Sequence, residues 1–589
     1  MTMKKITYLT VILLVSLMSC TKNFNKLNTN PNAFSSPDFD PVMSYVFKST
    51  TDQMENDNWG YLWEYGHIVD PYGERYNTGD NSRWNTYYIN VLGNLRQLEN
   101  LYGSNPGYAN RIAIAHIWES YIYYQLVATY GPIPYTHAGD KTPVILYDDE
   151  NTVYTSLLSK LKMATSSITT TGDKMTTDLI FNGNLTQWIK FGNALRLKIA
   201  LQVQKNLPDL AATNIKDVMS NEALLPQSDA DDAMFAYGAS SGSQSAYYIH
   251  YVLNETAANA IKQTTGPIMS DYVFTYFRSY QDPRLGAYFN PAQSPVGIKD
   301  TLTSSADALH HVVTYTIPHL GTPKSTAVLA QWNLTAQIFQ AGLNYITNFS
   351  TMPGLTQLPV KTPSGINLLA ANRSFYHTTY ADVCFMKAEA SMLGYVGAQS
   401  AQAYYTAGIN ANFAFWGLTP AQATTYEAQN GIAWSTAGHG FNYPQGYINT
   451  SIPADNMTKI WIQQWINSYD DGAFDAWCLQ RRTRNLSLPP HTNPGTIDRP
   501  VSAYADMPDR WNYPLAETSV NPVGVANGTK ELGNYDYPST ILQFAKTYTH
   551  PDWATVNAFY DDSYIEKWYG TTIDALKSQQ IPYTVLSTY

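Results

Sequence analysis

The chain has 589 residues, of which 44% are hydrophobic and 14% charged, and its formal net charge is -10. This acidic balance argues against a nucleic-acid-binding protein, because such proteins present a basic face that displaces counterions from phosphates. The hydrophobic content is ample for a large core, whereas 46 Tyr and 14 Trp are more than a core needs. We therefore expect part of the aromatic surface to lie near solvent.

The first twenty residues have the pattern of a lipoprotein signal. Lys4 and Lys5 precede the apolar run 6–18, and the small residue Ser19 stands directly before Cys20. This run is shorter than the roughly 20 residues that cross a bilayer as a helix. We expect residues 1–19 to be removed and Cys20 to be acylated, for example by palmitate, with a tether over 20–40 and the folded domain over 41–589. Cleavage without lipidation is the alternative.

Apolar residues at three-to-four spacing predict helices along much of the chain. The predicted helices cover residues 87–102, 111–130, 153–168, 186–203, 380–395, 401–416 and 456–477. The segments 379–394 and 400–416 have the length and small-residue content of a tetratricopeptide-type helical pair, without the full consensus. We predict a mainly α fold in one integrated domain, with a tetratricopeptide-like scaffold mainly over 41–220 and 376–485.

The regions between the predicted helices differ in composition. Residues 225–375 and 417–455 are rich in Gly, Ser, Thr, Asn, Pro and Tyr. We expect these long loop-rich insertions to form the main binding region, because binding surfaces often lie on ordered loops carried by a rigid scaffold. Cys384 and Cys478 lie in helical, apolar stretches and are expected to be buried free thiols, with a disulfide between them as the alternative.

Charged residues in the predicted helices are interpreted as scaffold features. Arg481 and Arg482 near a helix end suit the helix dipole and are expected to bond loop carbonyls or the carboxylates of Asp470 and Asp471. Three adjacent carboxylate pairs are expected in solvated turns or helix caps, because a glycosidase places its two carboxyls about 5–9 Å apart across a sugar. These pairs are Asp148-Asp149, Asp231-Asp232 and Asp470-Asp471.

Patterns of catalysis and metal binding are weak in this sequence. Residues 238–242 match the Gly-x-Ser-x-Gly nucleophile elbow around Ser240, but only the short strand candidate 233–237 leads into it. His310-His311 has no i, i+4 partner and no Cys cluster that would complete a zinc site. We therefore predict no catalytic residues, no metal and no other cofactor.

Aromatic residues are densest between Trp59 and Tyr88, where they alternate with acids, amides and arginines. Flat rings bordered by hydrogen-bonding groups suit a neutral oligosaccharide or a peptide backbone. The candidate ligand contacts here are Trp59, Trp63, Tyr72, Arg75, Asp80 and Trp84. A second, weaker patch contains Tyr247, Tyr248 and Trp332. For any one of these rings, packing in the core is an equally good explanation.

Several segments carry a resemblance to a known family. They are Phe24–Asn32, Tyr130–Tyr135, Trp188–Leu197, Asp282–Leu285, Tyr380–Ala390, Gln464–Trp477 with Arg481–Thr483, and Arg510–Pro514 with Glu517 and Asn521. In this order, after a lipoprotein signal, they resemble the SusD/RagB outer-membrane lipoproteins of Bacteroidetes, in the SusD-like subgroup. Pro132 and Asp475 depart from the usual family pattern without affecting the expected fold.

The resemblance implies a lipid-anchored lid that caps a TonB-dependent SusC-type transporter of the outer membrane, captures a nutrient and delivers it for import. It also implies aromatic platforms in the general part of the fold that contains the segment from Trp59 to Tyr88. We expect an oligosaccharide as the nutrient, with peptide capture as the close alternative and a surface hydrolase as the more distant one. Residues 21–24 lack the acidic cluster that often accompanies surface export, so the sequence leaves open which leaflet holds the anchor.

Overall fold

A computed structural model describes residues 37–66, 69–70, 79–140, 142–253, 268–269, 277, 280, 282–288, 370–436, 455–483, 508–538 and 540–545. The signal segment and Cys20 lie outside the described residues. So do residues 291–369 and 437–454 of the predicted loop-rich region, together with His310 and His311.

Helices dominate the described residues. The first group is α3 (Phe39–Asp57), η1 (Asn58–Leu62), α4 (Trp63–Tyr65), α5 (Ser82–Asn85), η2 (Thr86–Leu92), α6 (Gly93–Tyr102), η3 (Pro106–Tyr108), α7 (Ala109–Tyr130), α8 (Glu150–Ser167), α9 (Leu185–Gln202), α10 (Pro208–Met219), η4 (Glu222–Leu224), η5 (Asp229–Asp231), α11 (Ala246–Tyr248), η6 (Ile249–Leu253) and α13 (Arg284–Tyr288). The second group is α18 (Tyr380–Met392), α19 (Ala401–Phe415), α20 (Pro420–Glu427), α21 (Asn456–Asn467), η9 (Asp470–Gly472), α22 (Ala473–Thr483), α23 (Glu517–Val520), α24 (Pro522–Glu531) and η11 (Gln543–Ala545).

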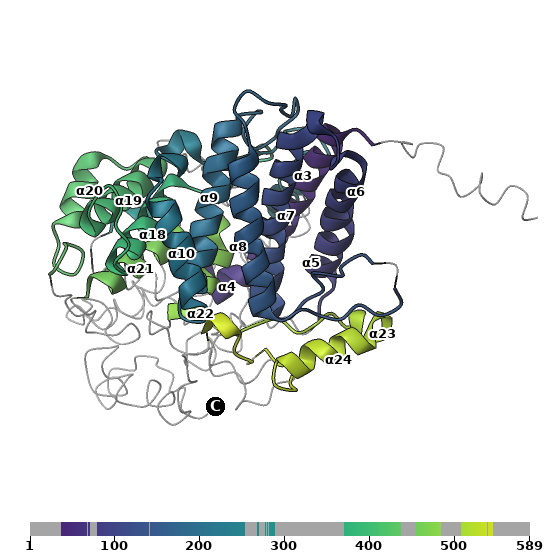
Figure 1. Cartoon of the computed structure of the whole chain (residues 1–589). Coiled ribbons are helices and arrows are strands. Elements are labelled where there is room, and N and C mark those ends of the chain that lie inside the picture. Colours follow the sequence, from purple (N-terminus) through teal and green to yellow (C-terminus); the bar gives the residue numbers. More distant parts are fainter. Residues whose placement is uncertain are drawn as a thin grey trace, which may run out of the picture.

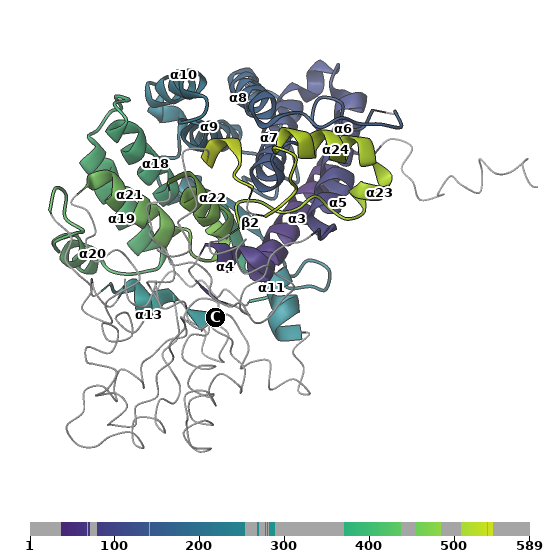
Figure 2. The same cartoon turned by 90° about the horizontal axis from the view of Figure 1, so that it is seen from below.

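The helices pack as successive neighbours in one array (Figure 1). Helix α8 contacts α7 and α9, α9 contacts α10, and α18 contacts α19 and α21. A contact between α9 and α18 joins the two groups, so the predicted mainly α fold with a helical-pair scaffold is confirmed. Figure 2 shows α4 and α11 on the side of the molecule away from α8 and α10.

Short antiparallel strand pairs complete the described part of the chain. β1 (Val69–Asp70) pairs with β3 (Ile268–Met269), and β2 (Ala233–Ala236) pairs with β4 (Ser374–Thr378). In the second pair Met234 lies opposite Tyr376, and Phe235 lies opposite Phe375. The predicted strand at 233–237 is therefore confirmed, and it connects the two halves of the helical array.

The predicted helices agree with the structure in five of seven cases, within a few residues at each end: 111–130, 153–168, 186–203, 380–395 and 401–416. The predicted helix 87–102 begins earlier, at Ser82, and includes the π-helical segment η2. The single predicted helix 456–477 is wrong, because the chain breaks between α21 and α22 where Asp470 adopts a φ of 67°. Helices α3, α10, α20 and α24 were not predicted.

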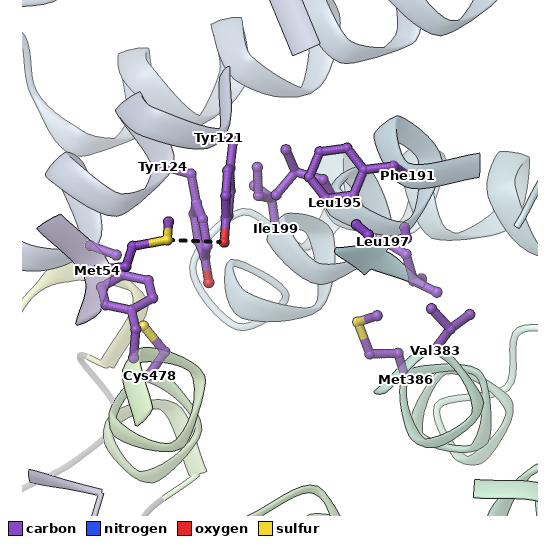
Figure 3. Packing of buried hydrophobic residues seen from close by; sticks show 14 of the residues in the cluster. Met54, Tyr121, Tyr124, Phe191, Leu195, Leu197, Ile199, Val383, Met386 and Cys478 are labelled. Atoms are coloured by element: carbon purple, nitrogen blue, oxygen red, sulfur yellow. Dashed lines mark hydrogen bonds between the residues drawn. The ribbon is translucent and has the colours of Figure 1, made fainter. Parts of the chain in front are cut away.

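The buried hydrophobic residues form one core cluster that runs from Phe39 to Ala545, and Figure 3 shows the part that includes residues of α7, α9 and α18. Phe191, Leu195 and Ile199 of α9 form the stripe expected from four-residue spacing, and all three are buried. Trp118 of α7 packs edge-on against Phe47, with ring centroids 4.7 Å apart, and its indole nitrogen donates to Thr50 Oγ1 at 3.1 Å. Buried indole N–H groups with a partner add little desolvation cost to the packing that they provide.

Both cysteines in the described residues are buried and free, as predicted. Arg481 confirms the expected bond to a loop carbonyl, because it donates to Asp509 O at 2.8 Å; it also donates to Ala128 O of α7 at 2.6 Å. Arg482 lies in the last turn of α22, as expected for the helix dipole, but its expected partners are wrong: its guanidinium pairs with Glu389 at 2.5 and 2.7 Å and not with Asp470 or Asp471. Among the helices described, none combines the length and apolarity needed to span a membrane.

Two glycines at helix ends allow a matched test of packing. Gly131 ends α7 with a φ of 82°, and an added Cβ would lie 2.8 Å from Leu542 Cδ2. Gly394 follows α18 with a φ of 92°, and nothing lies within 4 Å of an added Cβ. We expect Gly394→Ala to lower the free energy of unfolding by about 1–2 kcal/mol through the left-handed backbone. Gly131→Ala should lose about 1–3 kcal/mol more, because it also overpacks the core.

Urea unfolding followed by circular dichroism measures both losses. Equal losses in the two variants would contradict the packing that we describe around Gly131.

Candidate functional site

Two predicted aromatic patches, far apart in the sequence, meet in the structure. Trp59 lies in η1 and His250 in η6, and their rings stack with centroids 3.8 Å apart and planes 13° apart. Both side chains are partly exposed. We call Trp59 and His250 the aromatic pair. Each partner lies in a π-helical segment, and such segments are rare and often mark functional sites.

A buried layer supports the aromatic pair. Trp63 and Tyr247 pack with ring centroids 5.1 Å apart. Asn58 donates from Nδ2 to the Tyr247 hydroxyl at 3.1 Å, and the indole nitrogen of Trp63 donates to Asp470 O at 2.9 Å. These contacts fix the start of η1 against α11. Trp59, which lies between Asn58 and Trp63 in the sequence, is therefore held in place by this buried layer.

The structure separates the predicted ligand contacts into three sets. Trp63, Trp84 and Tyr247 are only 2%, 3% and 0% exposed, so they are corrected here to core residues. Trp59 and Tyr248 are partly exposed, and Asp80 is exposed with its Oδ1 accepting from Ser82 N at 2.7 Å. Tyr72, Arg75 and Trp332 lie outside the described residues.

His250 was missed by the sequence analysis, although it lies within the second aromatic patch. The contact of its imidazole with Trp59 joins two distant segments that no periodicity connects. In the sequence, Tyr248 lies between the buried Tyr247 and the partly exposed His250. Its backbone nitrogen donates to Ser245 Oγ at 3.5 Å at the start of α11.

A group of buried charged side chains adjoins Tyr247 of the buried layer. Arg373 Nη2 is 2.7 Å from Asp470 Oδ2 and 2.6 Å from Asp471 Oδ1, and Arg373 Nε is 3.6 Å from Glu55 Oε1. We call these four residues the charge cluster. The guanidinium also lies over the Tyr247 ring, 4.7 Å from its centroid. The prediction that Asp470-Asp471 forms a solvated turn or cap is therefore wrong.

The other two acidic pairs differ from this cluster. Asp149 caps α8 and accepts from Thr152 N at 3.1 Å, as expected for a helix cap. Asp232 accepts from Tyr380 N at 2.7 Å, and burial raises the pKa of its carboxyl to about 8. The sequence alone did not distinguish these environments.

Burial dominates the protonation of the charge cluster. It raises the pKa of Glu55 to about 7, although Arg373 and hydrogen bonds from Ser245 and Tyr247 oppose the shift. Burial also raises the pKa values of Asp470 and Asp471, and Arg373 again opposes it. One guanidinium thus faces three carboxyls, and burial raises the pKa of each of them above its ordinary value.

A cavity of about 60 Å³ lies beside the charge cluster and is lined partly by Arg373, Asp382, Asn467 and Asp471. Drug-sized ligand pockets span about 300–1,000 Å³, so this cavity has room for a few water molecules and none for an oligosaccharide. Within the described ranges, no group of three or more His, Cys, Asp or Glu side chains is arranged to hold a metal ion. The partly exposed aromatic pair is therefore the better candidate for ligand contact.

The pKa of Glu55 gives a test of the cluster. Its folded value of about 7 lies above the ordinary value of 4.5, so the folded state binds more protons between these pH values. The stability from this group is present below pH 4.5 and is lost as the pH rises through 7, with a total on the order of 3 kcal/mol. We expect Glu55→Gln to flatten the fall in Tm between pH 5 and pH 8, measured by scanning calorimetry.

Glu389→Gln is the matched control, because this buried carboxyl has the opposite shift. Burial raises its pKa, but pairing with Arg482 outweighs burial and the net pKa is lowered. Its contribution is lost only as the pH falls through that lowered value, so Glu389→Gln should lower Tm similarly at pH 5 and pH 8. An unchanged slope in Glu55→Gln would show that Glu55 does not titrate in this range.

Comparison with known proteins adds to this geometry. Residues 31–514 match the SusD-like family model described as "Starch-binding associating with outer membrane". A solved chitin-binding protein is similar with a TM-score of 0.66 at 18% identity, over 86% of this chain and 100% of its own. A comparison with curated protein sequences gave no match.

Two further solved structures have similar scores. A SusD-like protein from Bacteroidetes has a TM-score of 0.66 at 20% identity, over 86% of this chain and 100% of its own. A chitin-binding SusD homologue from Flavobacterium johnsoniae has a TM-score of 0.64 at 20% identity, over 86% and 98%. At these identities the similarity shows a shared fold.

Proposed function

Because the chain belongs to the SusD-like family, whose model is described as starch-binding and associating with the outer membrane, we propose that it captures an oligosaccharide for uptake. In this proposal the protein is the lid of a SusC-type TonB-dependent transporter and passes the bound nutrient to it. The observation that carries the proposal is the aromatic pair, which is partly exposed and supported by a rigid buried layer.

The chemistry of the aromatic pair favours a sugar ligand. An indole face attracts the apolar C–H face of a pyranose ring, and neighbouring polar groups can bond its hydroxyls. Asn56 Oδ1 accepts from the Trp59 indole nitrogen at 3.2 Å, which holds the orientation of this ring. A preformed ring loses little conformational freedom when a ligand binds.

A binding role without catalysis is part of the proposal. Ser240 is the central serine of the Gly-x-Ser-x-Gly match, and it is exposed in a loop. Its backbone oxygen accepts a hydrogen bond from Ser243 Oγ at 2.7 Å. Within the described ranges, Ser240 makes no hydrogen bond to a histidine or a carboxylate. A catalytic serine requires such a base within hydrogen-bond reach.

The first prediction of this proposal concerns Trp59. We expect Trp59→Ala to weaken oligosaccharide binding by about tenfold or more, because it removes the flat face of the aromatic pair. Isothermal titration with chitin and starch oligosaccharides measures the affinity. Trp434→Ala is the control, since Trp434 is also partly exposed but packs against Tyr405, with centroids 5.6 Å apart.

The same titrations distinguish glycan from peptide capture. If no oligosaccharide binds and peptides do, with Trp59→Ala weakening peptide binding, peptide capture replaces glycan capture. Turnover of a glycan, ester or peptide that Ser240→Ala abolishes would instead establish a hydrolase.

The second prediction concerns the anchor and the partner. We expect Cys20→Ala to move the protein from the outer-membrane fraction to the soluble fraction, because the acyl chains supply the attachment. Fractionation and immunoblotting measure this change. Detergent-solubilised membranes with wild-type protein should yield a complex with a large barrel protein. Retention of the variant in the membrane, or a wild-type chain that purifies alone, would oppose this proposal.

A further inference from the structure

Two tyrosines that follow α24 expose their rings side by side. Tyr535 is 61% exposed and Tyr537 is 55% exposed. Their ring centroids are 5.7 Å apart and their planes differ by 15°. At this separation near-parallel rings are offset, so that part of each face remains open to a ligand. We call these residues the tyrosine pair.

The residue between them turns inward and orients the pair. Asp536 forms an ion pair with the buried guanidinium of Arg510, and its Oδ1 and Oδ2 each lie 3.2 Å from Tyr513 N, which donates to them. The Asn512 side-chain amide also donates to Asp536 O. Asp536 is thus partly buried by these contacts, whereas Tyr535 and Tyr537 on either side of it are both exposed.

The backbone around the tyrosine pair is also bonded on both sides. Thr540 donates from Oγ1 to Tyr535 O and from its backbone nitrogen to Tyr537 O, each at 3.0 Å. Asp509 N donates to Pro538 O at 2.7 Å. The pair is thus held before any ligand arrives, which lowers the entropy lost on binding.

The dimensions of the tyrosine pair fit a sugar chain better than a protein surface. A stable protein interface covers about 800 Å² on each partner, far more than two rings present. A pyranose needs only one flat ring face for its C–H groups and water or amides for its hydroxyls. The phenol groups and the exposed Asn534 supply such polar groups at the edge.

We propose that the tyrosine pair is a second contact for a neutral polysaccharide, on a segment distinct from the aromatic pair. This inference rests on the proposed function, because it takes the ligand to be a glycan. A second contact lengthens the time that a long glycan chain stays on the protein. Once one contact holds the chain, the rest of the chain remains near the other contact at a high effective concentration.

The test uses the full-length protein in native gels that contain soluble starch or glycol chitin. We expect the double variant Tyr535→Ala with Tyr537→Ala to be retarded less by the polymer that retards wild type, with an apparent affinity lower by about five- to tenfold. Tyr535→Phe with Tyr537→Phe keeps both rings and should stay near wild type. Tyr45→Ala, which removes a 50% exposed tyrosine on α3, controls for loss of surface aromatics in general.

The outcomes separate this inference from the proposed function. Retardation of wild type that the double alanine variant leaves unchanged overturns the tyrosine pair alone. A polymer that retards neither wild type nor any variant removes the basis of both proposals. The double alanine variant could also lose its complex with the barrel protein in solubilised membranes while its retardation by the polymer is unchanged. This result would assign the tyrosine pair to a protein contact and overturn the glycan site.

Discussion

Neutralising one buried arginine is the constraint on which this part of the molecule depends. Arg373 is only 4% exposed, and its guanidinium contacts Glu55, Asp470 and Asp471. Glu55 comes from α3, Asp470 and Asp471 come from η9, and Arg373 directly precedes β4. A buried charge that loses its partner costs about 3–5 kcal/mol, so the three segments must meet at this point. The left-handed backbone at Asp470 and the break between α21 and α22 follow from that requirement.

The same cluster positions the candidate site. Glu55 accepts from Ser245 Oγ at 2.9 Å and from Tyr247 N at 3.2 Å, which fixes α11 on α3. One turn further along the same helix Asn58 and Trp59 begin η1, and His250 follows α11 in η6. The stacking of Trp59 on His250 therefore depends on two helical segments that a buried carboxylate holds together. The orientation of these surface aromatics thus depends on buried charges.

Local pattern and distant contacts explain how much of this could be predicted from the sequence. The stripe Phe191, Leu195 and Ile199 is local, and periodicity identified it correctly. The break at Asp470 depends on Arg373, 97 residues away, and no local pattern indicates it. Trp59 and Trp63 are four residues apart and of one type, yet only Trp63 is buried, because it packs on Tyr247 and donates to Asp470 O, two contacts with distant segments that no local pattern indicates.

The two buried thiols have a practical consequence for chemistry on this protein. Burial raises the pKa of Cys384 to about 11 and also raises that of Cys478, so little reactive thiolate forms at neutral pH. Thiol reagents should therefore leave both sites unmodified in the native protein. A cysteine introduced on an exposed helix could then be labelled selectively, because Cys384 and Cys478 would not react. A spectroscopic probe at that position could report on the approach of a transporter without removal of native residues.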